Sequence, residues 1–349
     1  MISELKNRLK YMKRLQRNMD GRKRARTRKM TRIAAAYCLV MPIHKLRSLS
    51  KDKTRAPGLK KGFRHLERFV ILYQTGKLLK RDDDVEVNST EQSTDPPVSE
   101  AQEEAISLCL ERDNGMCVFT GSSSAEACHI IPRLLHSSGS KIALASSCTK
   151  ELFPNYPPST DLAQFPGEVD PLDLSYNMLT LDRILRQRQA AGQVAVQSMG
   201  TTADVKGNRF GAIELKLRRL RVRNKWRPND KFELTIDNLS DMLGQDGSPS
   251  SSDAGLQDRD DYPTTDSRSV QIEMLKPFLR HMDMLVRMQH TCLQISAMSG
   301  AANACALARA EDFEADFQGS PLFEDILDDS VSENDSRRRV LSWLEDRQE

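Results

Sequence analysis

Residues 111–132 read ERDNGMCVFTGSSSAEACHIIP, and this stretch decides how the middle of the chain folds. Asn114 and Gly115 are typical of a helix end, and the run HIIP that closes the stretch has the apolar character of a short strand. Farther along, residues 177–196 read NMLTLDRILRQRQAAGQVAV. This pattern predicts a strand, a helix at about 182–191 and another strand. The sequence therefore predicts a small unit of mixed α and β structure.

The remaining elements of this unit follow from similar patterns. A helix is expected from residue 99 to about residue 112, because Ser99 and Gln102 have the spacing of a capping box. Short strand-like runs are expected at 116–120, 127–131, 178–181, 193–197 and 209–223.

The composition indicates one modest core with polar extensions. The chain has 349 residues, of which 5% are aromatic and 29% are charged. An apolar run near the start, residues 33–43, is too short to span a bilayer, so we expect no membrane segment. The seven cysteines form no C-x-x-C pair, which is typical of a reduced intracellular protein and disfavours a structural zinc site.

The charges are divided unevenly along the chain. Residues 1–81 hold 25 Lys and Arg against 4 Asp and Glu, whereas residues 82–349 hold 27 against 45. The two parts therefore have formal net charges of +21 and −18. This imbalance indicates either a polyanionic partner for the basic part, such as DNA or another nucleic acid, or pairing of the basic arm with the acidic tail, within one chain or between copies.

Changes in composition predict the domain boundaries. Two prolines, Pro96 and Pro97, prevent a helix before the predicted α+β domain, and a stretch rich in turn-forming residues after it is expected to be disordered. The expected segments are a basic helical arm (1–81), a linker (82–98), the α+β domain (99–240, with its core at 116–197), a disordered linker (244–268), an amphipathic helix (269–300) and an acidic tail (307–349).

A helix with one apolar stripe is expected at residues 2–19, and a basic run follows it. Residues 21–29 read GRKRARTRK, a composition typical of nuclear-import and nucleic-acid-binding segments and also of a solvated basic surface. The first interpretation predicts an intracellular, nuclear protein. An Arg-rich, acid-poor start is also typical of a mitochondrial presequence, which is the alternative. The candidate nucleic-acid contacts are Arg22, Lys23, Arg24, Arg26, Arg28, Lys29, Arg183 and Arg186.

Two groups of residues form a motif with a fixed order. The first contains Arg112-Asp113, Cys117, Thr120-Gly121 and His129-Ile130-Ile131-Pro132, and the second contains Asn177, Leu179, Thr180 and Leu181. This order resembles the HNH endonuclease family, in particular the HNH-type domains of fungal proteins. The resemblance covers about residues 105–200, less than a third of the chain.

The resemblance implies a small ββα-metal fold that cleaves DNA with a divalent ion, Mg²⁺ or Zn²⁺. His129 would be the general base, because the pKa of an imidazole lies near neutrality. Asn177 would position His129 or help to hold the metal. Asp173 is a further candidate ligand, since Mg²⁺ prefers oxygen.

Arg186 departs from the family pattern. It stands nine residues after Asn177, where the family has a metal-ligating His, and Gln189-Ala190 replace an aromatic-Asp pair. A guanidinium stays protonated and has no lone pair for a cation, so Arg186 cannot replace that ligand. We therefore expect metal-dependent cleavage of DNA to be weakened or lost. The alternative is a catalytically inactive HNH fold that binds nucleic acid or protein.

Overall fold

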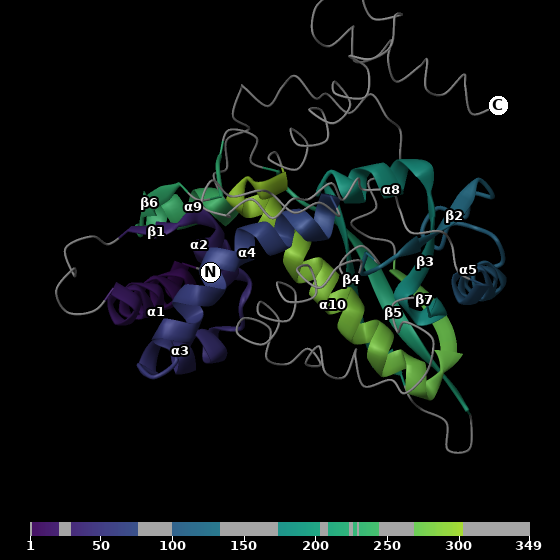
Figure 1. Cartoon of the computed structure of the whole chain (residues 1–349), viewed down its shortest axis with the longest axis horizontal. Helices are drawn as coiled ribbons and strands as arrows, with labels where there is room; N and C mark the ends of the chain where they lie inside the picture. The colour runs from purple at the N-terminus through teal and green to yellow at the C-terminus, as the bar shows by residue number, and fades with distance from the viewer. Residues whose placement is uncertain are drawn as a thin grey trace, which may run out of the picture. The chain divides into compact units, whose positions relative to one another are not determined.

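The structure, a computed structural model of the chain, describes residues 2–20, 29–75, 100–132, 174–202, 209–222, 226–228, 230–243 and 269–302. These residues form helices and small antiparallel sheets, so the predicted α+β class is confirmed (Figure 1). Within the described stretches, no helix combines the length and the apolar character needed to cross a bilayer.

Three helices near the N-terminus pack through their apolar faces. Leu5, Met12 and Leu15 recur at helical spacing along α1 (Ile2–Asp20) and are all buried. The neighbours of α1 include α3 (Ile43–Lys51) and α4 (Ala56–Thr75). Burial of these side chains removes their apolar surface from water, which is the main favourable contribution to the stability of such a helix.

A fourth helix, α2 (Arg32–Val40), is buried along most of its length. The guanidinium of Arg8 in α1 donates to the carbonyl oxygens of Cys38 and Met41, at 3.1 and 2.7 Å. These are carbonyls at the end of α2, where intrahelical donors are lacking. Arg8 therefore caps α2 and joins it to α1.

The middle of the chain begins with α5 (Glu100–Arg112). Asn114 and Gly115 follow its last turn and stop the helix, as the sequence predicts. The φ angles of these two residues are 55° and 64°, in the left-handed region that commonly terminates a helix. A turn then leads to the strand β2 (Ala125–His129).

The strand β2 pairs antiparallel with β3 (Met178–Asp182). A short 3-10 helix, η4 (Ser175–Asn177), precedes β3, and α8 (Arg183–Ala190) follows it directly. Two strands and a helix thus lie next to each other in the order β2, β3, α8 (Figure 1).

A three-stranded antiparallel sheet follows, in the order β4 (Val194–Thr202), β5 (Phe210–Arg219), β7 (Ser269–Leu275). Apolar and polar residues alternate along β5, so that one face is buried. The long helix α10 (Lys276–Ser299) packs on this sheet, mainly on β4.

A second, smaller sheet joins two distant parts of the chain. The strand β1 (Lys29–Thr31) pairs antiparallel with β6 (Lys231–Glu233). The helix α9 (Ile236–Leu243) follows β6 and packs on α1.

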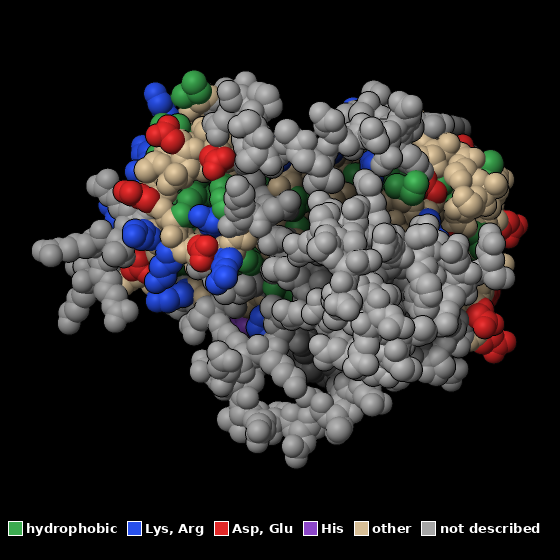
Figure 2. All heavy atoms as spheres, turned by 90° about the horizontal axis from the view of Figure 1, so that it is seen from above, with side chains coloured by type: hydrophobic (Ala, Val, Ile, Leu, Met, Phe, Trp, Pro, Cys, Tyr) green, Lys and Arg blue, Asp and Glu red, His purple; other side chains and the backbone are tan. Residues whose placement is uncertain are grey.

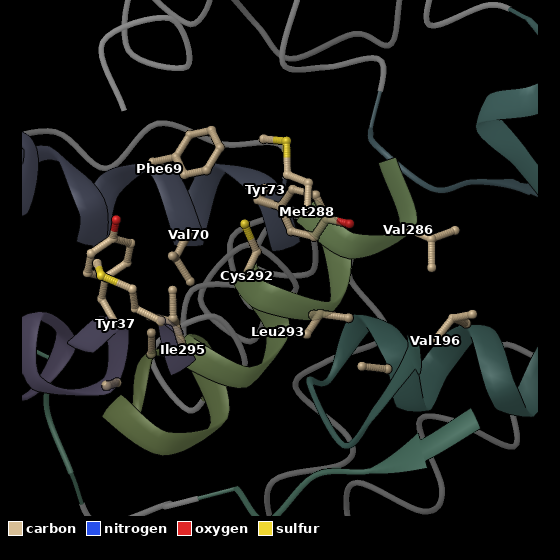
Figure 3. Packing of buried hydrophobic residues seen from close by; sticks show 14 of the residues in the cluster. Tyr37, Phe69, Val70, Tyr73, Val196, Val286, Met288, Cys292, Leu293 and Ile295 are labelled. Atoms are coloured by element: carbon tan, nitrogen blue, oxygen red, sulfur yellow. The ribbon is translucent and has the colours of Figure 1, made fainter. Parts of the chain in front are cut away.

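The helix α10 lies at the centre of the core. Figure 3 shows Cys292 and Leu293 of α10 in the same cluster as Tyr73 of α4 and Val196 of β4. Residues from α1, α2, α4, the β2–β3 pair, the three-stranded sheet and α10 all belong to one buried apolar cluster. The N-terminal helices are therefore part of the same core as the predicted α+β domain. Two strands from outside 99–240 also pair with strands of that segment, β7 with β5 and β1 with β6.

Two segments differ from the sequence predictions. Residues 116–120, predicted as a strand, form turns in which the amide of Gly121 donates to the carbonyl of Cys117 at 2.8 Å. Residues 269–275, predicted as the start of a helix, form β7 because they pair with β5. The helix begins at Lys276, and Pro277 lies in its first turn, where a missing N–H costs nothing. The predicted linkers at 82–98 and 244–268 and the acidic tail at 307–349 lie outside the described residues.

Candidate functional site

The candidate site lies where β2 ends beside the start of β3. His129 is the last residue of β2 and is paired in register with Met178, the first residue of β3. The amide of Ile130 donates to the carbonyl of Asn177 at 2.7 Å, which extends the pairing by one residue. His129 and Asn177, separated by 48 positions in the sequence, are thus brought to the same end of the strand pair.

The side chain of Asn177 holds the chain just after His129. Its Oδ1 accepts the amide N–H of Ile131 at 2.9 Å, and its Nδ2 donates to the carbonyl of Ile131 at 3.0 Å. Asn177 has no exposed surface, and a buried peptide group requires such partners. Of the two roles predicted for Asn177, these contacts support the positioning of the His129 segment.

The carbonyl of Ile130 is held from two other directions. The hydroxyl of Tyr73 in α4 donates to it at 2.6 Å, and Nε2 of Gln289 in α10 donates to it at 3.2 Å. Sequence reasoning missed both residues, because they lie 57 and 159 positions from Ile130 and belong to helices whose patterns indicate only packing. The backbone after His129 is therefore fixed by three separate elements, η4, α4 and α10.

Arg112 and Asp113 join α5 to the same region. The guanidinium of Arg112 donates to Asp113, at 2.7 Å, and to the carbonyls of Ser175 and Met178, both at 3.0 Å. Oδ2 of Asp113 accepts the amide of Thr180 at 3.0 Å. The side chain of Asp113 is nearly fully buried, so its oxygens need these donors as hydrogen-bond partners. Arg112 and Asp113 therefore join the end of α5 to β3 through hydrogen bonds.

Thr120 performs a similar role at the other end of β3. Its hydroxyl donates to Oδ2 of Asp182 at 2.7 Å, while Oδ1 of Asp182 accepts the amide of Leu185 at 2.8 Å. Asp182 is therefore the N-cap of α8, and Thr120 holds the cap in place. Thr120 thus positions the turn from β3 into α8, whereas Arg112 and Asp113 hold the start and middle of β3.

Arg186 of α8 lies against Glu126 on one face of β2. Nη1 of Arg186 donates to Oε2 of Glu126 in an ion pair, and the exposed fractions of the two side chains are 59% and 60%. A pair this exposed is screened by water and contributes little to stability. Its importance is its location, because it puts a permanent positive charge against this face of the strand.

The alternation of side chains along β2 separates its residues into two groups. Ala127 packs against the small cluster formed with α5, so His129, two residues on, lies on that face as well. Cys128 lies on the α8 face, near Arg186. Burial raises the pKa of the Cys128 thiol to about 11, although the charge of Arg186 lowers it in part. The sequence leads one to expect His129 and Arg186 side by side, but the register places them on opposite faces.

The described residues of this site do not fit a divalent metal ion. The oxygen of Asn177 accepts an amide N–H, and both oxygens of Asp182 accept hydrogen bonds. On the α8 face of β2, the charge of Arg186 would repel a cation. Within the described stretches, no group of three or more His, Cys, Asp and Glu side chains is arranged as a metal site. Asp173, a predicted ligand, lies outside those stretches.

Only some of the residues predicted to contact nucleic acid lie in the described part of the chain. Arg183, at the start of α8, and Lys29, at the start of β1, are exposed. Arg186 is exposed but paired with Glu126. The remaining residues of the basic run, Arg22, Lys23, Arg24, Arg26 and Arg28, lie outside the described residues.

Comparisons of the chain with protein-family models, with curated proteins and with solved structures find no match. The resemblance to HNH endonucleases therefore depends on the quoted motif and on the geometry of β2, β3 and α8.

Proposed function

We propose that residues 100–200 are an HNH-type, ββα unit whose metal-dependent cleavage of DNA is weakened or lost. The strands and the helix follow in the order expected for such a unit, and His129 and Asn177 flank the same end of the strand pair. One observation carries the proposal: Arg186 of the helix forms an ion pair with Glu126 on the β2 face that the helix covers. Arg186 stands where the family pattern has a metal-ligating His, and its charge opposes the binding of a metal ion on the α8 face of β2.

The chemistry that remains is divided between His129, on one face of β2, and the arginines of α8, on the other. A histidine alone can take a proton from water, but a phosphodiester also needs positive charge against its oxygens as charge develops. Arg183 and Arg186 can offer such charge to a phosphate through N–H donors. We propose that this arrangement favours binding of DNA over its hydrolysis, in a nuclear protein.

Nicking of supercoiled plasmid by the full chain tests the catalytic part of the proposal. The full chain is needed because β1 and β7 complete the strand pairings of the 99–240 segment. We expect little or no nicking with Mg²⁺ or Zn²⁺, and the same residual rate for His129→Ala. Rapid nicking that is lost in His129→Ala and in chelator would show an active nuclease and contradict the proposal.

Duplex binding in the presence of chelator tests the alternative that the unit is a binding module. An inactive module retains its affinity for a short DNA duplex when metal is removed, because its contacts are made by Arg and Lys. Arg183→Gln with Arg186→Gln should weaken this binding, whereas Lys276→Gln with Arg280→Gln, on α10, should leave it unchanged. If the two double variants bind the duplex with equal affinity, α8 is not part of the DNA-binding surface.

A further inference from the structure

We infer that α1 carries a second surface for nucleic acid, formed by Lys6, Lys10, Lys13, Arg14 and Arg17, which binds the phosphate backbone of a duplex. This inference deepens the proposed nucleic-acid function and depends on it for the class of partner. The surface is separate from the basic run at 21–29 and from α8, which hold the candidate contact residues named from the sequence, and it assigns part of the charge of residues 1–81 to one side of α1.

The helical geometry gathers these five residues on one side of α1. At 3.6 residues per turn they fall within an arc of about 100° around the helix axis. The buried residues Leu5, Met12 and Leu15 lie on the other side, against the core. Lys6, Lys10, Arg14 and Arg17 are exposed, and Lys13 is half-buried. The position of the arc is therefore fixed by the packing of the helix.

The acidic residues of α1 do not neutralise this surface. Glu4 is paired with Arg8, at 3.0 Å, on the side that faces α2. Asp20 lies at the end of the helix and accepts a hydrogen bond from Gln16 at 2.7 Å. Among the described residues, Lys6, Lys10 and Arg14 have no carboxylate partner, so their charges are available to a partner.

The dimensions of the surface match a duplex. From Lys6 to Arg17 the helix rises about 16 Å. The phosphates of one strand advance about 3.4 Å each along the duplex axis, so the surface spans about five of them. In the sequence, α1 is followed directly by the basic run at 21–29, which adds further cations. Lys and Arg side chains are also prominent at the end of the molecule that holds the N-terminal helices (Figure 2).

Other polyanions fit this surface less well. A helix that binds a membrane inserts an apolar face, but the apolar face of α1 is buried in the core. A single strand is bound through stacking on exposed aromatic rings, and the one aromatic residue of α1, Tyr11, is partly buried against the core. Double-stranded nucleic acid needs neither feature, since charge alone gives most of its non-specific affinity.

The experiment measures the salt dependence of duplex binding by the full chain, in chelator, with fluorescently labelled 20-base-pair DNA and RNA duplexes. The test variant is Lys6→Gln, Lys10→Gln, Arg14→Gln and Arg17→Gln, because Gln is a good helix former. The control replaces four exposed cations of other segments: Arg209→Gln, Arg227→Gln, Lys231→Gln and Arg280→Gln. Circular dichroism and the urea midpoint confirm that both fold like the parent chain.

Each phosphate contact contributes about 0.9 to the slope of log affinity against log salt. We expect the slope of the α1 variant to be about 3 smaller than that of the parent chain, on the DNA or the RNA duplex, and the slope of the control to change by less than about 1. Equal slopes for the parent chain and the α1 variant would overturn the inference. The inference would also be overturned if the α1 variant bound the duplexes like the parent chain and lost binding only to phosphatidylserine vesicles.

The outcome is distinguishable from failure of the proposed function. Parent-like slopes in the α1 variant, together with weaker binding by Arg183→Gln with Arg186→Gln, would reject this surface and keep the α8 site. A reduced slope in the α1 variant, together with metal-dependent nicking that requires His129, would keep the surface and reject the proposed loss of cleavage.

Discussion

The hydroxyl of Tyr73 donates to the carbonyl of Ile130 at 2.6 Å, and so links a helix of the basic N-terminal part to the residue that follows His129. The two residues are 57 positions apart, and both are buried. The position of the candidate general base therefore depends on a helix outside the segment that carries the motif.

Removal of this hydroxyl tests the link. Tyr73→Phe keeps the ring in the core and deletes one hydrogen bond, while Gln289 still donates to the same carbonyl. We expect the free energy of unfolding in urea to fall by about 1 kcal/mol. The imidazole resonances of His129 should shift in the nuclear magnetic resonance spectrum. Tyr11→Phe, on α1, is the control and should change neither. Unchanged His129 resonances in Tyr73→Phe would show that the link does not position the site.

Asn177 should be more important for stability than for binding. Asn177→Ala leaves both the N–H and the carbonyl of Ile131 without their side-chain partner in a buried place. Each such group costs about 1 to 3 kcal/mol, so we expect a loss of about 3 kcal/mol in the free energy of unfolding. Asn238→Ala is a matched control, because Asn238 also donates to a backbone carbonyl, at 2.7 Å, but in a hydrogen bond that is exposed to solvent. A comparable loss in both variants would contradict the special role of Asn177.

Arg186→His should create a zinc site. The substitution would place an imidazole next to Glu126 and Cys128, and Zn²⁺ prefers such nitrogen, sulfur and carboxylate ligands. The thiol, whose pKa of about 11 keeps it protonated at neutral pH, loses its proton when it binds the ion. We expect zinc affinity, measured by calorimetry, to rise on the order of tenfold or more over the parent chain.

A second substitution separates this site from adventitious binding. Addition of Cys128→Ser to Arg186→His should return the affinity for zinc close to the parent value. If the double variant binds zinc as well as the single one, the imidazole at position 186 does not face Cys128. The assignment of β2 side chains to two faces would then be incorrect.

The helices and strands with strong local patterns could be predicted from the sequence. In α1, Leu5, Met12 and Leu15 repeat at helical spacing, and their burial follows from that repeat. The strand β3 is a short apolar run that follows the turn residue Asn177 and ends at Asp182, the N-cap of α8. Its position could therefore also be predicted. Both signals are local, and no distant contact is needed to produce them.

Residues 269–275 show where local patterns fail. Ile272 and Leu275 have a spacing that fits a helix, but Ile272 and Met274 also fit the alternation of a strand. A run this short satisfies both periods, and pairing with β5 decides between them. The contacts of Tyr73 and Gln289 with Ile130 were unpredictable for a related reason, because they depend on how α4 and α10 pack around the strand pair.

The stability of the core should depend on pH through His290 of α10. Burial, and then the charge of Arg218, lower the pKa of His290 from about 6.5 to about 4. Its Nε2 is buried and has no hydrogen-bond partner among the described residues. The folded chain therefore keeps this imidazole neutral under conditions in which the unfolded chain protonates it.

The folded state consequently binds fewer protons than the unfolded state between these two pKa values, so stability falls as the pH falls from about 6.5 to about 4. The shift corresponds to a loss of about 3 kcal/mol. His290→Leu removes the titrating group, and its urea midpoint should fall less than that of the parent chain between pH 7 and pH 4.5. His44→Leu, at an exposed position of α3, should behave like the parent chain. Parallel losses in the parent chain and His290→Leu would mean that other groups cause the acid sensitivity.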